Sequence, residues 1–257
     1  MQVRIFLAGA TGAVGRALAP MLVAWGYEVH GSTRQTARVA QLQALGVRPV
    51  VVDVYDAPTL SRALAAIKPT IVIHQLTDLP PALDPARMGE ALERNARVRR
   101  EGTRNLADAA LAAGASRLIA QSIAWAYAPG DGAQTRPHTE DHALDAQAQG
   151  TRGVSINGVI ALEDITLHTP GLAGTVLRYG QLYGPGTGFD DKRGTCPLHV
   201  EAAAAAAFLA LQRAAEGVFN FAEECAELDS GKARRELGWK PEMRTQDVLN
   251  LKTRRVA

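Results

Sequence analysis

Short apolar runs alternate with amphipathic stretches over the first two thirds of the chain. Short apolar runs bounded by glycine, proline or polar residues are typical of buried strands, whereas apolar residues three and four apart indicate helices. The expected strands cover residues 3–9, 27–33, 47–53, 69–76, 116–123 and 174–180. The expected helices cover residues 13–26, 36–46, 57–68, 84–113 and 154–168. This β–α alternation predicts a parallel sheet with helices on both faces.

The C-terminal third has a less regular pattern. It predicts a loop over residues 182–195, a helix over 201–214, a strand over 217–222 and a short helix over 230–239. We expect an α/β protein with a Rossmann-like, doubly wound parallel sheet that forms one domain over residues 1–257, and folds of this kind commonly bind dinucleotides such as NAD(P). Its cofactor part spans about residues 1–150, and a small C-terminal substrate-side lobe spans about 180–257.

One polar segment, residues 128–153, is long for a routine connection and contains several glycines and prolines. Long segments of this kind are usually functional, so the pattern predicts either a mobile lid or an ordered binding loop.

Composition adds limits rather than a function. The 257 residues are 47% hydrophobic and 21% charged with a net charge of +2, which gives no argument for nucleic acid or a membrane as partner. No apolar run approaches the ~20 residues of a membrane span, and the N-terminus enters a strand at once, unlike a secretory signal. We therefore expect a cytoplasmic protein in which Cys196 and Cys225 are free thiols.

The stretch GATGAVG places three glycines between the first strand and the first helix. Gly9 permits a tight turn, Gly12 lets the backbone approach a diphosphate, and Gly15 allows the helix to pack closely on the sheet. The free N–H groups at the helix N-terminus favour an anion there. The predicted cofactor contacts in this loop are Gly9, Thr11, Gly12, Ala13, Val14 and Gly15.

The end of the second strand indicates which dinucleotide is bound. NAD is normally held there by an acidic residue, but none occurs from Val29 to Leu45. Ser32, Thr33, Arg34 and Arg38 stand there instead, and a guanidinium suits a 2′-phosphate. The sequence therefore predicts a preference for NADP(H) over NAD(H), unless Arg34 is simply a solvated loop residue.

Further cofactor contacts are expected beyond the glycine loop. Asp53 either reaches the adenine amino group or stands at a helix N-terminus. The predicted contacts are Thr33, Arg34, Asp53, Val54, Gln75 and Leu76.

Several motifs together resemble a known family. They are GATGAVG (9–15), DV (53–54), EGTRNLADAA (101–110), LRYGQLYGPG (177–186), PLHVEAAAAA (197–206) and KARRELGWKP (232–241). The chain resembles the extended short-chain dehydrogenase/reductase superfamily, in particular its NAD-dependent epimerase/dehydratase branch. The resemblance implies a small-molecule substrate and a homodimer formed through the helices near 84–113 and 154–168.

The resemblance fails at the catalytic residues. The family uses a Tyr-x-x-x-Lys pair on one helix, and a Ser or Thr at the end of the fifth strand. Ser155 and Val159 occupy the Tyr and Lys positions here, and a shift by one residue gives only Ile156 and Ile160. Ile123 takes the position of the serine, with Ser122 one residue before it. The usual proton machinery is therefore predicted to be absent.

Other side chains near the carboxyl ends of the strands are candidates for the chemistry, because doubly wound folds bind ligands there. We consider Tyr127, Ser122 and Tyr179 as catalytic candidates, and Trp125, Gln181 and Tyr183 as substrate contacts. Aromatic residues also pack at pocket rims for structural reasons, so that alternative stays open.

Other polar clusters point to structure rather than chemistry. HTEDH (138–142) has the wrong order for a zinc-binding helix, so no metal site is predicted. His74 and His199 are expected to have structural roles first. Arg97, Arg100 and Arg104 form one helical stripe that is best interpreted as a solvated face.

Two functions from different classes remain. The first is an NADP(H)-dependent oxidoreductase or epimerase-like enzyme that acts on a small carbonyl or sugar-derived substrate with non-standard catalytic residues. The second is a non-catalytic NADP(H)-binding sensor resembling the NmrA-like proteins, which share the glycine loop without Tyr-x-x-x-Lys.

Overall fold

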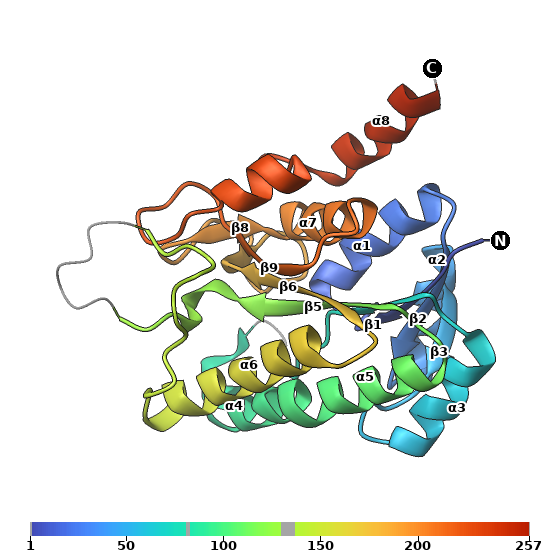
Figure 1. Cartoon of the computed structure of the whole chain (residues 1–257), viewed down its shortest axis with the longest axis horizontal. Coiled ribbons are helices and arrows are strands. Elements are labelled where there is room, and N and C mark those ends of the chain that lie inside the picture. The colour runs from blue at the N-terminus through green and yellow to red at the C-terminus, as the bar shows by residue number, and fades with distance from the viewer. Residues whose placement is uncertain (1, 81–82, 130–136, 257) are drawn as a thin grey trace.

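The computed structural model describes residues 2–80, 83–129 and 137–256. Its centre is a parallel sheet of seven strands in the order β3-β2-β1-β4-β5-β6-β9 (Figure 1). The strands are β1 (Arg4–Ala8), β2 (Glu28–Thr33), β3 (Arg48–Val51), β4 (Ile71–His74), β5 (Arg117–Ile123), β6 (Ala173–Tyr179) and β9 (Gly217–Phe221). The strands β2 and β3 extend the sheet on one side of β1, and β4, β5, β6 and β9 extend it on the other. The strand order therefore reverses between β1 and β4, where such folds bind ligands.

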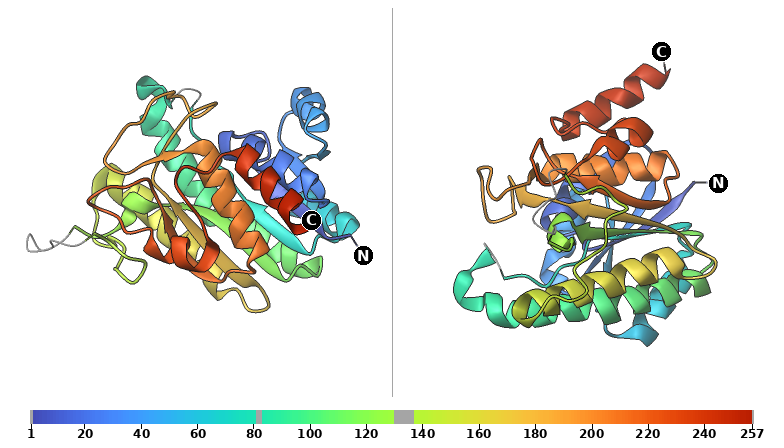
Figure 2. Two further views of the ribbon diagram at one scale, coloured as in Figure 1. Left: turned by 90° about the horizontal axis from the view of Figure 1, so that it is seen from above. Right: turned by 60° about the vertical axis from the view of Figure 1, so that its left-hand side comes forward.

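Helices cover both faces of the sheet, as the alternating pattern predicts (Figure 2, right). One layer contains α1 (Ala13–Ala24), α2 (Val39–Ala44), α7 (Val200–Gln212) and α8 (Thr245–Val256). The other contains α3 (Ala57–Ile67), α4 (Met88–Arg97), α5 (Thr103–Ala112) and α6 (Gly150–His168). Short helical turns are η1 (Thr36–Arg38), η3 (Pro85–Arg87), η5 (Ala124–Ala126) and the π-helical turns η4 (Val98–Gly102) and η6 (Ala233–Leu237). The predicted Rossmann-like α/β fold is confirmed.

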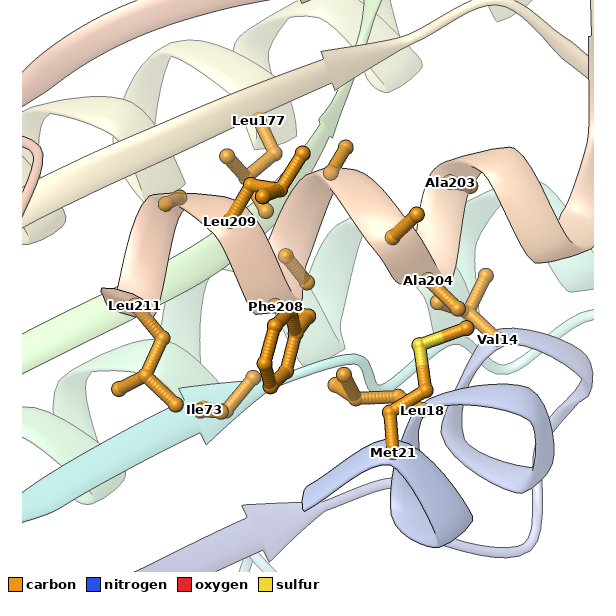
Figure 3. Close-up of a cluster of buried hydrophobic side chains, with 14 of the residues drawn as sticks. Val14, Leu18, Met21, Ile73, Leu177, Ala203, Ala204, Phe208, Leu209 and Leu211 are labelled. Atoms are coloured by element: carbon orange, nitrogen blue, oxygen red, sulfur yellow. The ribbon is translucent and has the colours of Figure 1, made fainter. Parts of the chain in front are cut away.

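The alanine-rich helix α7 fills the core on the first face of the sheet (Figure 3). Residues 202–207 are completely buried alanines, whose small side chains let the helix lie close to its neighbours. Phe208 packs in the same cluster as Leu18 of α1 and Ile73 of β4. This cluster holds the first helix, and with it the glycine loop, against the sheet.

The structure departs from the sequence prediction in the C-terminal third. β9 joins the main sheet and α7 covers it, so this third is not wholly a separate lobe. A small parallel sheet of β7 (Gln181–Tyr183) and β8 (Pro197–His199), and the helix α8, were not predicted.

The predicted helix over 84–113 is η3, α4, η4 and α5 in succession.

Part of the long polar segment lies outside the described residues, and the rest is ordered against the body. Tyr127 bridges to Leu144 and His138 bridges to Leu228. Within the described ranges, no helix combines the length and apolar character that crossing a membrane requires.

The prediction of two free thiols is wrong: Cys196 and Cys225 form a disulfide. The backbone N–H of Glu223 donates to the carbonyl of Pro197 at 2.8 Å, which brings the segment after β9 beside β8. The two cysteines are 29 residues apart in sequence, and their spacing gives no sign of this tertiary contact.

Candidate active site

A cavity of about 330 Å³ opens at the carboxyl ends of β1, β2 and β4. Its position is the switch point of the strand order, where a dinucleotide is expected. It brings together eight of the twelve predicted cofactor contacts: Gly9, Thr11, Gly12, Thr33, Arg34, Val54, Gln75 and Leu76. Ala13, Val14, Gly15 and Asp53 do not line it.

The glycine loop has the geometry of a diphosphate cradle. Gly9 has φ +86°, and its N–H donates to the Ser32 hydroxyl at 3.3 Å. The N–H of Gly12 donates to the Gly9 carbonyl at 3.0 Å, and α1 begins at the next residue. A Cβ on Gly15 would lie 2.2 Å from the Gly9 carbonyl oxygen, so Gly15 serves the close packing of loop and helix.

The corner of the cavity at the end of β2 carries the cationic side chains. Thr33, Arg34 and Arg38 all line it. A guanidinium nitrogen of Arg34 lies 3.6 Å from the Asp78 carboxylate, and half of the Arg34 side chain is exposed. Asp78 also lies 3.8 Å from Arg94. Arg34 is therefore a surface cation at the cavity mouth, with a weak and exchangeable partner.

Asp53 does not face the cavity; its carboxylate accepts a hydrogen bond from the Tyr55 N–H at 3.0 Å. Tyr55, which sequence reasoning missed, lines the cavity, and the Arg97 guanidinium lies 4.1 Å from its ring centre. Because Arg97 lies over this ring, its interpretation as a purely solvated residue is incomplete. Burial raises the pKa of the Tyr55 hydroxyl.

Two polar groups of the cavity lining are buried without a hydrogen-bond partner in the part of the chain that the structure describes. They are the Tyr55 hydroxyl and the Gln75 amide. Buried polar groups are normally hydrogen-bonded, so their state fits a lining that meets polar atoms of a ligand. Together with the glycine loop, the residues present fit a nicotinamide dinucleotide.

The helix α6 carries neither a tyrosine nor a lysine. Ser155 and Val159, at the positions of the family's tyrosine and lysine, are both buried. The hydroxyl of Ser122 donates to Glu163 at 2.6 Å. Glu163 in turn forms a buried ion pair with Arg178, with an N–O distance of 2.6 Å. Ser122 is thus a member of a structural network.

The two catalytic tyrosine candidates are also engaged. Tyr127 is buried; its hydroxyl donates to the Asn220 side chain and accepts from Arg178, both at 2.7 Å. Tyr179 is buried, and its hydroxyl donates to the Ala203 carbonyl at 2.9 Å. Burial raises the pKa of both hydroxyls. A tyrosine with a raised pKa and occupied partners is a poor acid–base group at neutral pH.

The three predicted substrate contacts are not gathered at the cavity. Trp125 is 41% exposed on η5. Gln181 accepts a hydrogen bond from the Cys196 N–H at 3.0 Å. The Tyr183 hydroxyl donates to Glu223 at 2.5 Å, and burial followed by this carboxylate raises its pKa to about 12.

The histidines have structural partners. The Nδ1 of His74 accepts from the Leu76 N–H, so Nε2 carries the proton and faces the Thr103 hydroxyl at 3.1 Å. Burial lowers the pKa of His74 to about 4. His199 caps α7 by accepting from the Glu201 N–H, and His138 stacks on Tyr127.

Comparison with known proteins places this geometry in a family. Residues 5–242 match the NAD-dependent epimerase/dehydratase family. A curated relative from Streptomyces sp., 3-diazoavenalumate denitrifying reductase, is 37% identical over 243 residues, covering 86% of this chain and 76% of the relative.

Solved structures show the same fold. UDP-glucose 4-epimerase of Thermotoga maritima, solved with UDP-glucose, is 18% identical, with a TM-score of 0.73 and coverage of 99% of this chain and 100% of that one. WbmG of Bordetella bronchiseptica, solved with NAD, is 21% identical, with a TM-score of 0.69 and coverage of 97% and 92%. The protein belongs to the NAD-dependent epimerase/dehydratase family.

Proposed function

We propose that this protein is an NADP(H)-dependent reductase whose substrate accepts hydride without a proton from the protein. The observation that carries the proposal is the state of the candidate acids. Ser155 and Val159 replace the usual pair, and Ser122, Tyr127 and Tyr179 are each bound to other protein groups. Epimerisation through a keto intermediate and carbonyl reduction both need a proton moved at oxygen, so this site suits them poorly.

The name of the curated relative indicates a reaction that suits a site without a protein acid. That protein is a denitrifying reductase of a diazo compound. At a carbon bearing a diazonium group, hydride forms the new C–H bond while the C–N bond breaks and its electron pair leaves with dinitrogen. When bound, NADPH supplies that hydride, so that R–N₂⁺ and NADPH become R–H, N₂ and NADP⁺. No protein acid is required, and we propose a small diazo-bearing compound as the substrate class.

The chain's own residues then have binding and orienting roles. The backbone N–H groups in the first turn of α1, which begins at Ala13, would hold the diphosphate. Thr33, Arg34 and Arg38 surround the position expected for a 2′-phosphate. The lack of an acidic residue on the loop after β2 supports NADP(H) over NAD(H).

The cofactor part of the proposal is tested with Arg34→Ala. The variant should bind NADPH about 10–100-fold more weakly, as expected for a lost charged hydrogen bond, while its affinity for NADH stays the same. Titration by cofactor fluorescence measures both, and Arg100→Ala, an exposed arginine on η4, is the matched control. Tighter binding of NADH than NADPH by the wild-type protein contradicts the preference.

The reaction is tested with NADPH and benzenediazonium as probe, with the uncatalysed rate subtracted. We expect NADPH oxidation with one N₂ released per NADPH, and no turnover of simple aldehydes, ketones or UDP-glucose. Faster turnover of a carbonyl or a sugar nucleotide contradicts the proposal. Tight cofactor binding with no turnover of any substrate favours the non-catalytic sensor instead.

A further inference from the structure

A buried arginine lies where the family's acid–base pair is missing. Arg99 stands in the π-helical turn η4 between α4 and α5, and only 8% of it is exposed. The helices around it pack tightly: a Cβ on Gly158 of α6 would lie 2.9 Å from the Cα of Ala96. Arg99 enters this seam, and one guanidinium nitrogen donates to the backbone carbonyl of Ser155 at 3.3 Å.

Most N–H donors of this guanidinium have no acceptor among the described residues. A guanidinium carries five N–H donors, and the Ser155 carbonyl is the sole hydrogen-bond acceptor of Arg99 among the described residues. No described carboxylate forms an ion pair with it. Completely inaccessible side-chain atoms without a partner occur at Tyr55, Gln75 and Arg117 in the described ranges, but not at Arg99. The remaining guanidinium nitrogens of Arg99 are therefore not completely inaccessible, and they lie outside the lining of the cavity at the glycine loop.

The charge of Arg99 is also uncompensated. The carboxylate that most favours its charged form is Glu163, but both Glu163 oxygens already accept hydrogen bonds from Arg178. One of them accepts from Ser122 as well. Burial lowers the pKa of Arg99 to about 10, which leaves the guanidinium charged at neutral pH. A buried cation without a counter-ion is costly, so a bound anion would stabilise this arrangement.

The surroundings of Arg99 belong to the reaction end of the site. It contacts Ser155, the residue at the position of the family's tyrosine. It also lies close enough to His74, the last residue of β4, to lower the pKa of that imidazole. The carboxyl ends of the central strands are where ligands bind in this fold, and the glycine loop and Arg34 line a cavity there to which Arg99 does not contribute.

We propose that Arg99 is a substrate-binding residue that takes the carboxylate of an acidic substrate through its free N–H donors. The inference rests on the proposed function, because it names the substrate class of the same site as a diazo-bearing carboxylic acid. A carboxylate matches the paired N–H groups of a guanidinium and would neutralise a buried charge that has no ion-pair partner among the described residues.

The test measures binding without turnover, on protein saturated with NADP⁺. Benzoate and its neutral isostere benzamide are titrated by isothermal calorimetry into wild-type protein, Arg99→Gln, Arg99→Lys and the control Arg100→Gln. Arg100 is the exposed neighbour on the same turn. We expect wild type and Arg100→Gln to bind benzoate at least tenfold more tightly than benzamide. Arg99→Gln should lose this preference while keeping its affinity for NADP⁺, and Arg99→Lys should keep part of it.

Equal binding of benzoate and benzamide by wild type overturns the proposal, as does an unchanged benzoate affinity in Arg99→Gln. If Arg99→Gln does not fold, a crystal structure of wild type with NADP⁺ and benzoate decides: a carboxylate on Arg99 supports the inference, and one bound elsewhere overturns it. Because no turnover is measured, failure of the reductase reaction leaves this result readable.

Discussion

The Glu163→Gln variant tests the buried network formed by Ser122, Glu163 and Arg178. Both side chains of the Glu163–Arg178 pair are 6% exposed. One Glu163 oxygen accepts from Arg178 at 3.0 Å and from Ser122 at 2.6 Å, and the other accepts from Arg178 at 2.6 Å. Glutamine has the same shape, but it removes the charge and turns an N–H group toward the guanidinium.

Breaking one partner of a buried pair costs about 3–5 kcal/mol, because the remaining charge is left unpaired. That is a large part of the roughly 5–15 kcal/mol that stabilises a typical domain. For a chain of this size it corresponds to a fall in Tm of about 10 °C. Urea unfolding followed by circular dichroism, together with scanning calorimetry, measures the change.

The neighbouring residue supplies a matched control. Asp164 pairs with His168 on the exposed side of α6. Asp164→Asn should therefore change the free energy of unfolding by less than about 0.5 kcal/mol. A Glu163→Leu, Arg178→Met double variant should recover much of the lost stability, because neither charge remains. A loss below about 1 kcal/mol in Glu163→Gln would refute the reasoning about the buried pair.

Three further predictions follow from other parts of the structure. Gly15→Ala should weaken NADPH binding and cost about 1–3 kcal/mol of stability, because its Cβ would lie 2.2 Å from the Gly9 carbonyl oxygen; an unchanged cofactor affinity in a fluorescence titration contradicts this. Reduction of the Cys196–Cys225 disulfide by dithiothreitol should lower stability by about 3–4 kcal/mol, seen as a lower Tm. Alkylation before reduction shows whether the disulfide is present, because only free thiols react. If neither cysteine is alkylated and reduction leaves Tm unchanged, the prediction is contradicted. His74 is neutral in the folded state with a pKa of about 4, whereas the unfolded chain takes up the proton near pH 6.5. The contribution of His74 to the free energy of unfolding is therefore complete above pH 6.5 and falls as the pH drops toward 4. Unfolding measured across this range should show that the free energy changes less steeply with pH in His74→Gln than in wild type. Identical slopes for the two proteins count against this assignment.

The parts of the protein that could be predicted from sequence are those fixed by local spacing. Three glycines after a buried strand determine the loop, and strand ends in a parallel sheet share one edge, so Thr33, Val54 and Gln75 meet at one cavity. The absence of a Tyr-x-x-x-Lys pair from α6 is a feature of the sequence itself, because its i,i+4 spacing is local.

The remaining features depend on contacts between distant segments. Glu163 and Arg178 belong to α6 and β6, and their pairing appears only when helix and strand pack. Cys196 and Cys225 meet because β8 and the segment after β9 lie together. Arg99 lies in sequence between Arg97 and Arg100, two arginines interpreted as a solvated face, yet it is buried in the seam between α4 and α6. A π-helical turn shifts the helical face by part of a turn, and the periodicity of the sequence does not reveal it.

The central claim is that hydride reaches the substrate without a proton from the protein. The most direct measurement follows the origin of the new C–H bond, with benzenediazonium as probe and NADPH deuterated at either the 4R or the 4S position. We expect monodeuterated benzene from one of the two cofactors, no deuterium from D₂O, and the same rate in H₂O and D₂O. Deuterium drawn from the solvent, or a rate that falls clearly in D₂O, would contradict it.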